Sequence, residues 1–117
     1  MIVNLTGRHV EITEALKTHV EEKLQRALKD FPRIESVRVI LTLEKHRHLA
    51  EIVVQAPYHL HAEAREETHD MYLSIDAAIE KVLTQLRRRA EKGQAHKAVG
   101  LGRTESIVAK DETQPEL

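Results

Sequence analysis

The chain has 117 residues, 41% hydrophobic and 32% charged, which is enough for one domain with its own core. It contains no cysteine, which excludes disulfides, thiolate nucleophiles and cysteine-bound zinc. No apolar run reaches membrane-spanning length and the N-terminus lacks a signal-peptide pattern. We therefore expect a cytoplasmic protein without membrane contact.

The formal net charge of -1 hides an uneven distribution. Residues 1–80 carry 10 basic and 14 acidic side chains, residues 81–103 carry 7 and 1, and residues 104–117 carry 1 and 4. A basic segment beside a mildly acidic body indicates an anionic partner, because a polyanion responds to the local field. A solvated helix end would give the same pattern, so charge alone does not decide.

The first third of the chain predicts a strand and a helix. Val3 and Leu5 alternate with polar residues, which indicates a short strand that Gly7 ends through its tolerance of positive φ. Apolar residues at every fourth position, 16 to 28, then indicate an amphipathic helix with Thr13 as its N-cap. Pro32 stops this helix.

The middle of the chain predicts three strands, and the last part a long helix. Residues 37–44 and 50–56 alternate around the loop 45–48, and residues 60–65 alternate after the turn at Pro57 and Tyr58. From Asp70, a cap, a helical period runs to about Lys92, where Gly93 can end the helix. Residues 94–117 show no sustained period and are expected to be largely disordered.

These elements give an α+β fold in the order β-α-β-β-β-α. The first two strands should be parallel because a helix joins them, whereas the last three should be antiparallel, giving a four-stranded mixed sheet. Both helices should cover one face, since each has a single apolar stripe. We assign residues 1–95 to one domain and residues 96–117 to a flexible, acidic C-terminal tail.

The second helix carries the candidate binding surface. Its stripe is spaced by four, three and four residues and consists of Lys81, Gln85, Arg88 and Lys92, widened by Arg87 and Arg89. Such a stripe suits the phosphates of a nucleic-acid backbone. A solvated face is the alternative, but few acids lie nearby to pair with the arginines, so we favour RNA. Arg8, Lys23 and Arg26 would extend the surface if the helices lie side by side.

Metal binding and catalysis have weaker support. His46, His48, His59 and His61 could gather, but no cysteine joins them and no HExxH spacing occurs, so solvated or RNA-contacting histidines are the better interpretation. The loop residues Glu66, Glu67, His69 and Asp70 are typical of a solvated turn before a helix. We predict no catalytic residue, metal, cofactor or small-molecule substrate.

The sequence resembles the short ribosome hibernation-promoting factor and ribosome-associated inhibitor family, also called the sigma-54 modulation protein family. The N-terminal motif is Gly7-Arg8-His9 followed by Glu11-Ile12-Thr13-Glu14-Ala15-Leu16, with Lys23 in the first helix. The second-helix motif is Asp70-Met71-Tyr72 with Ile75, Asp76, Lys81, Gln85 and Leu86. Together they cover about residues 1–95. One departure is Leu73-Ser74, where the family usually has two small residues, and this leaves the local packing open.

The resemblance implies a bacterial stress or stationary-phase factor, monomeric when free, whose domain is similar to a double-stranded RNA-binding domain. Such a factor lodges in the small ribosomal subunit where messenger and transfer RNA would sit. Carried over by motif, Arg8, Lys23, Arg26, Lys81, Gln85, Arg88 and Lys92 would lie against ribosomal RNA; Arg87 and Arg89 are added on charge.

Two other functions remain open from the sequence. One is a general structured-RNA-binding module, because a basic helical face recognises helix shape. The other is a small-molecule-sensing domain with a pocket between sheet and helices, although the inward positions offer few polar groups to orient a ligand. The sequence also leaves open whether the factor pairs ribosomes into dimers or keeps them single, and whether the tail orders on binding.

Overall fold

The computed structural model describes the backbone of residues 1–58 and 60–99, and side chains as far as residue 90. It divides the chain into a first unit, Met1–Leu86, and a second that begins at Arg87. The elements are β1 (Ile2–Arg8), α1 (Glu14–Ala27), β2 (Ser36–Glu44), β3 (Arg47–Ala56), β4 (Leu60–Thr68) and α2 (Met71–Val99). The predicted order of elements is confirmed.

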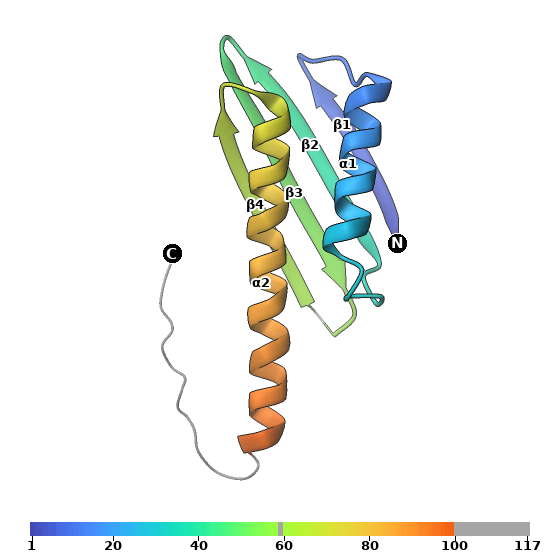
Figure 1. The fold of residues 1–117 in the computed structure, drawn as a ribbon, viewed down its shortest axis with the longest axis vertical. Coiled ribbons are helices and arrows are strands. Elements are labelled where there is room, and N and C mark those ends of the chain that lie inside the picture. The colour runs from blue at the N-terminus through green and yellow to red at the C-terminus, as the bar shows by residue number, and fades with distance from the viewer. Residues whose placement is uncertain (59, 100–117) are drawn as a thin grey trace. The chain divides into compact units, whose positions relative to one another are not determined.

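The four strands form one sheet in the order β1-β2-β3-β4. β1 is parallel to β2, whereas β2, β3 and β4 are antiparallel to their neighbours, as predicted. One cross-sheet row runs from Leu5 through Val39 and Ile52 to Ala64. β1 and β4 are the two edge strands of the sheet (Figure 1).

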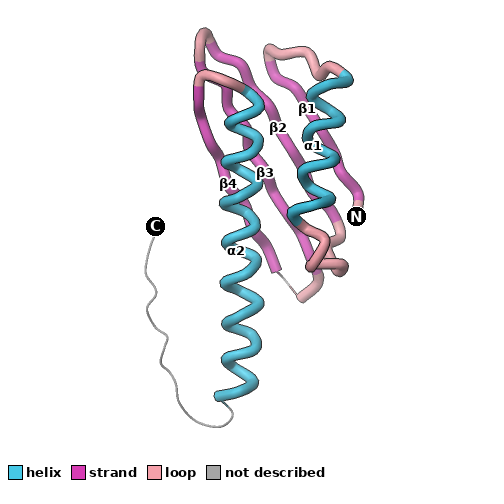
Figure 2. Tube along the Cα trace, in the orientation of Figure 1, coloured by secondary structure: helices cyan, strands magenta, loops and turns pink. Residues whose placement is uncertain are grey.

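Both helices of the first unit lie on the same face of the sheet, α1 on the side of β1 and β2, and α2 on the side of β3 and β4 (Figure 2). Between helices and sheet lies an aliphatic core. Its largest fully buried side chains are Val20, Leu24, Val37, Val39, Leu41, Ile52, Val54, Ile75, Ile79, Val82 and Leu86. The alternation in the strands and the helical period thus identified these fully buried positions correctly, whereas Leu43 and Leu60, which the alternation also placed inside, are only partly buried.

Ser74 is the one polar side chain fully buried among the described residues. Its hydroxyl donates to the backbone oxygen of His48 at 2.6 Å, which satisfies the buried group. Leu73 beside it is 49% exposed. The Leu73-Ser74 departure therefore puts the small residue in the core and the large one at the surface, and the fold accommodates both.

Both predicted helix caps are present. The Thr13 hydroxyl accepts a hydrogen bond from the backbone N–H of Leu16 at 3.1 Å. The Asp70 carboxylate accepts one from the N–H of Tyr72 at 2.9 Å, in the first turn of α2. Each cap satisfies a donor that the helix itself leaves unpaired.

The prediction that Gly7 ends the first strand was wrong, because β1 continues to Arg8. A Cβ at Gly7 would lie 2.4 Å from the backbone oxygen of Val10 and 3.0 Å from the side chain of Ile12. The glycine is needed for this close approach. The left-handed backbone that turns the chain belongs to His9, with φ of 60°.

The prediction that α2 ends near Gly93 was also wrong, since the helix continues to Val99. The expected disorder of residues 94–117 is therefore incorrect for residues 94–99. A glycine inside a helix costs only about 1 kcal/mol relative to alanine, and the surrounding sequence is rich in Ala, Glu, Gln and Lys, which favour helix. The predicted acidic tail from residue 100 on lies outside the described residues. No helix in the described part of the chain is both long and apolar enough to cross a bilayer.

Candidate nucleic-acid interface

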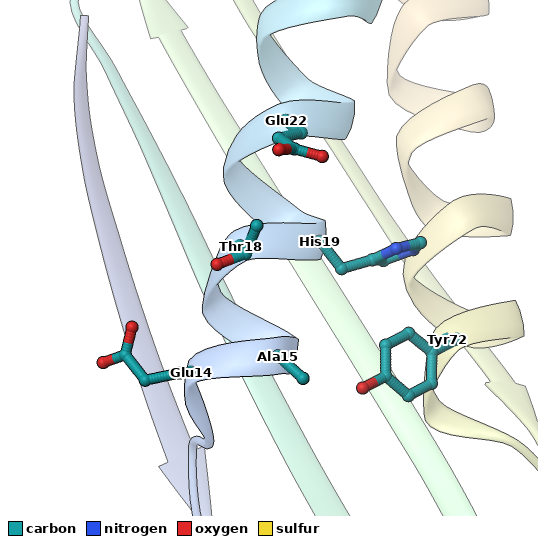
Figure 3. Close-up of a pocket in the computed structure, with 6 residues that line it drawn as sticks. All are labelled: Glu14, Ala15, Thr18, His19, Glu22 and Tyr72. Carbon is teal, nitrogen blue, oxygen red and sulfur yellow. The ribbon is translucent and has the colours of Figure 1, made fainter.

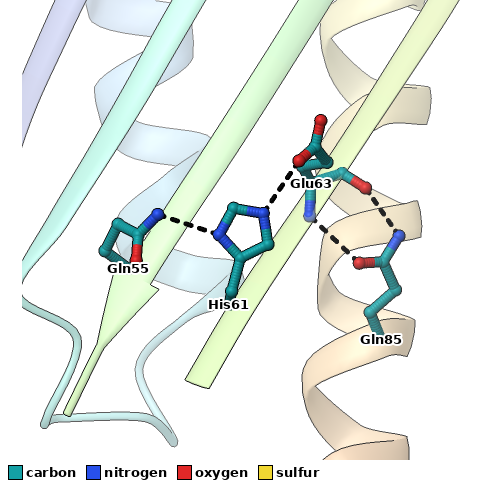
Figure 4. Close-up of polar contacts among 4 residues, drawn as sticks. All are labelled: Gln55, His61, Glu63 and Gln85. Carbon is teal, nitrogen blue, oxygen red and sulfur yellow. Dashed lines mark hydrogen bonds and ion pairs between the residues drawn. The ribbon is translucent and has the colours of Figure 1, made fainter. Parts of the chain in front are cut away.

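Lys81 and Gln85 face the edge strand β4 from α2. The Lys81 ammonium forms an ion pair with the carboxylate of Glu66. The Gln85 side-chain oxygen accepts from the backbone N–H of Glu63 at 3.0 Å, and its amide nitrogen donates to the Glu63 carbonyl at 2.7 Å (Figure 4). Gln85 thus satisfies both backbone groups that one residue of an edge strand turns outward.

Lys23 and Arg26 belong to α1, which lies beside α2 on the flank opposite to Lys81 and Gln85. They follow His19 by four and seven residues on α1, so the three share one side of that helix. His19 identifies this side as the one facing α2, because its Nε2 lies 2.7 Å from the Asp76 carboxylate. Arg26 is exposed and Lys23 is half-buried. The helices do lie side by side, but the basic residues of α1 and the pair Lys81 and Gln85 are on opposite flanks of α2.

Arg8 stands apart from both groups. It is exposed at the last position of β1, and strand alternation puts it on the sheet face opposite to Val3 and Leu5, which pack against the core. It lies near the start of α1, whereas Arg26 lies near the end of that helix. The structure therefore does not bring Arg8 and Arg26 together.

The arginine run occupies α2 just beyond the first unit. Arg87, Arg88 and Arg89 are all exposed. No ion pair of these three occurs among the side chains that the structure describes. The side chain of Lys92 lies outside the described residues. The run is thus a concentrated set of exposed cations on a regular helix.

An open depression lies between the N-terminal halves of α1 and α2. It is lined by Glu14, Ala15, Thr18, His19, Glu22 and Tyr72 (Figure 3). Tyr72 stacks edge-on against the His19 ring, with ring centroids 4.9 Å apart. The two glutamates make this surface unsuited to phosphate, and its openness makes it a poor enclosure for a small ligand.

Among the histidines and acidic residues that we considered for metal binding or catalysis, His61, Glu66 and Asp70 make polar contacts within the protein, and Glu66 lies in β4 and not in the predicted loop. The His61 ring nitrogens lie 2.8 Å from Gln55 and 2.8 Å from Glu63 (Figure 4). Glu66 pairs with Lys81, and Asp70 caps α2. Within the described part of the chain, no three His, Asp or Glu residues are grouped closely enough to hold a metal. His59 lies outside the described residues.

Sequence reasoning gave no role to Tyr58, which it placed only in a turn. Tyr58 is 87% exposed and has a positive φ of 63°. The sequence did contain a signal of this exposed residue, namely an aromatic residue at the tip of a predicted hairpin, where Asn, Asp or Gly is usual.

A family model described as "Sigma 54 modulation protein / S30EA ribosomal protein" matches residues 3–94. A ribosome hibernation promoting factor of Pseudomonas putida is 40% identical over 95 residues, covering 81% of this chain and 92% of the relative. Its Salmonella typhimurium counterpart is 39% identical over 97 residues, covering 82% of this chain and 100% of the relative.

Two solved structures have folds similar to that of this chain. A ribosomal subunit interface protein from Coxiella burnetii has a TM-score of 0.73 and 28% identity, over 78% of this chain and 99% of that chain. The N-terminal domain of Protein Y from Thermus thermophilus has a TM-score of 0.68 and 36% identity, over 75% of this chain and 98% of that chain.

Proposed function

This chain belongs to the Sigma 54 modulation protein / S30EA ribosomal protein family, and from that membership we propose that it is a cytoplasmic ribosome hibernation factor that binds the small ribosomal subunit through ribosomal RNA. It would act by occupying the places of messenger and transfer RNA in stress or stationary phase. Blocking these places requires a protein that binds there and has a fitting shape. It requires no catalysis, cofactor or small-molecule substrate.

The observation that carries the RNA contact is the exposed arginine run on α2. Arg87, Arg88 and Arg89 are exposed, and Lys92 follows at the spacing of one helical turn from Arg88 or Arg89. Lysine and arginine at helical spacing meet successive phosphates, and each such pairing releases condensed counterions. We place the principal phosphate contacts on these four residues.

The remaining basic residues have secondary places in the proposal. Arg8, Lys23 and Arg26 are available as flanking contacts on separate parts of the first unit. Lys81 and Gln85 already bond to β4. A contact of either with RNA would require those bonds to open, so we assign these two residues a weaker share of the affinity.

The test is a charge reversal with a matched control. Replacing Arg87, Arg88 and Lys92 by glutamate should reduce affinity for purified small subunits strongly, while the thermal midpoint changes little, because exposed charges contribute little to stability. The control reverses three other exposed lysines, Lys17, Lys29 and Lys45, and produces the same change in net charge. Filter binding at several potassium concentrations measures the affinity of both variants for small subunits.

The salt dependence gives a second readout. The slope of log affinity against log salt should fall by about one for each phosphate that the protein no longer neutralises, hence by roughly two to three in the first variant. Equal weakening by the control reversal would show that total charge, and not the α2 run, governs binding. Unchanged affinity in the first variant would contradict the proposed interface.

Sedimentation of the tagged chain through ribosome profiles separates this function from a general structured-RNA-binding module. Comigration with small subunits and whole ribosomes is expected. A pool that stays free or travels with messenger RNA would favour the general module instead.

A further inference from the structure

Tyr58 presents its ring to solvent at the turn between β3 and β4. At 87%, it is the most exposed of the large hydrophobic side chains that the structure describes. The other two aromatic residues behave differently, because Phe31 packs against the core and Tyr72 against His19. The ring of Tyr58 therefore contributes almost nothing to the stability of the fold through burial.

The backbone at Tyr58 is unfavourable for this residue type. The N–H of Leu60 donates to the carbonyl of Pro57 at 3.3 Å, which makes Tyr58 the first central residue of a β-turn. Its φ of 63° lies in the left-handed region, where turns of this kind usually have Gly, Asn or Asp. A bulky residue here opposes local preference, and an exposed strained position of this type points to a role in recognition.

The turn lies at the end of the first unit where α1 ends (Figure 1). The backbone N–H of Glu35 donates to the carbonyl of Gln55 at 2.8 Å, which ties the connection after α1 to the strand that leads into the turn. Gln85 holds α2 against Glu63 in the first half of β4, the strand that follows the turn. The chain then leaves the unit after Leu86, and its next three residues are the arginines of the candidate interface.

We propose that Tyr58 is a stacking contact for an unpaired nucleobase of ribosomal RNA, a site that rests on the proposed function. Unpaired bases of RNA stack on exposed aromatic rings, and such stacking tolerates every base because each has a π-face. The arginine run supplies phosphate contacts that carry no sequence information. A stacked base on the first unit would add a contact that fixes the register of the protein on folded RNA.

The experiment compares three variants of the full chain. Tyr58→Asn removes the ring and suits the left-handed backbone, so its thermal midpoint should stay unchanged or rise by a few degrees. Its affinity for small subunits should nevertheless fall by between about five-fold and 150-fold, the range for loss of one stacked base. Tyr58→Phe keeps the ring without the hydroxyl and should bind like the wild type.

Tyr58→Trp supplies a direct probe, because the chain contains no other tryptophan. Its fluorescence should be quenched when small subunits bind, and ultraviolet cross-linking from position 58 should recover ribosomal RNA. A cross-link to a ribosomal protein alone would overturn the assignment to a nucleobase. Equal weakening in Tyr58→Phe and Tyr58→Asn would overturn stacking, because it would make the hydroxyl the essential group.

Failure of this inference is distinguishable from failure of the proposed function. If the wild type binds small subunits and Tyr58→Asn binds equally well, Tyr58 is not a contact while the function stands. If the wild type does not bind small subunits at all, the proposed function fails and the stacking site fails with it.

Discussion

Replacing Gln85 by methionine is expected to loosen α2 from β4 while leaving ribosome binding largely intact. Methionine is close to glutamine in length and volume but makes neither of the two hydrogen bonds to the Glu63 backbone. The change therefore removes both hydrogen bonds between α2 and β4 without creating a large cavity. It separates two roles for Gln85, a direct RNA contact and a bond that positions α2.

The expected loss of stability follows from the two bonds. A hydrogen bond within a protein contributes about 0.5–1.5 kcal/mol net. Glu63 is exposed, so water can replace Gln85 at both backbone groups, which puts each bond near the low end of that range. We expect a total loss of about 1 kcal/mol, which lowers the thermal midpoint of a domain of this size by about 4–8 °C.

Thermal unfolding followed by circular dichroism at 222 nm measures this change, and filter binding to small subunits measures affinity. Gln25→Met is the matched control, since Gln25 is exposed on α1. It should unfold and bind like the wild type. An unchanged midpoint for Gln85→Met together with a ten-fold loss of affinity would refute our reasoning and make Gln85 an RNA contact.

Three further changes test the fold itself. Gly7→Ala should destabilise by about 1–3 kcal/mol, because the new methyl group would meet the backbone oxygen of Val10; an undiminished denaturant midpoint would contradict this close approach. Thr13→Ala should lower the free energy of unfolding by about 1 kcal/mol through loss of the α1 cap. Thr13→Ser keeps a capping hydroxyl and should retain most of the wild-type stability, and urea titration measures both variants. Leu24→Ala should cost about 2–5 kcal/mol, and a loss below 1 kcal/mol would mean that the core closes over the cavity.

The fold was largely predictable because its determinants are local patterns. Alternation in the strands and a period of four in α1 identify positions such as Val39, Ile52 and Leu24 as buried, and the structure confirms each. Gly7 and Gly93 were misjudged for a shared reason. A glycine is compatible with a turn, a helix end or a close approach, and only the neighbouring atoms determine which applies.

The candidate site was less predictable than the fold. Helical spacing correctly grouped Lys81 with Gln85, but a period does not say which strand lies beside the helix. The bonds to Glu63 and Glu66 therefore appear only in three dimensions. The exposure of Tyr58 was not predicted for a related reason, since a turn prediction specifies which residues are preferred and says nothing of how far an unusual one protrudes.

The position of β1 in the sheet has a consequence for the order in which the molecule assembles and opens. β1 pairs with β2 alone, and its partner for Ile2 is Ser36, across the whole of α1. The meander of β2, β3 and β4 closes through short turns, so its contacts form at a lower entropic cost and should form earlier. We therefore expect β1 to dock last onto a preformed sheet. In the native protein, hydrogen exchange should therefore replace the amide protons of β1 before those of β3, which is paired on both sides.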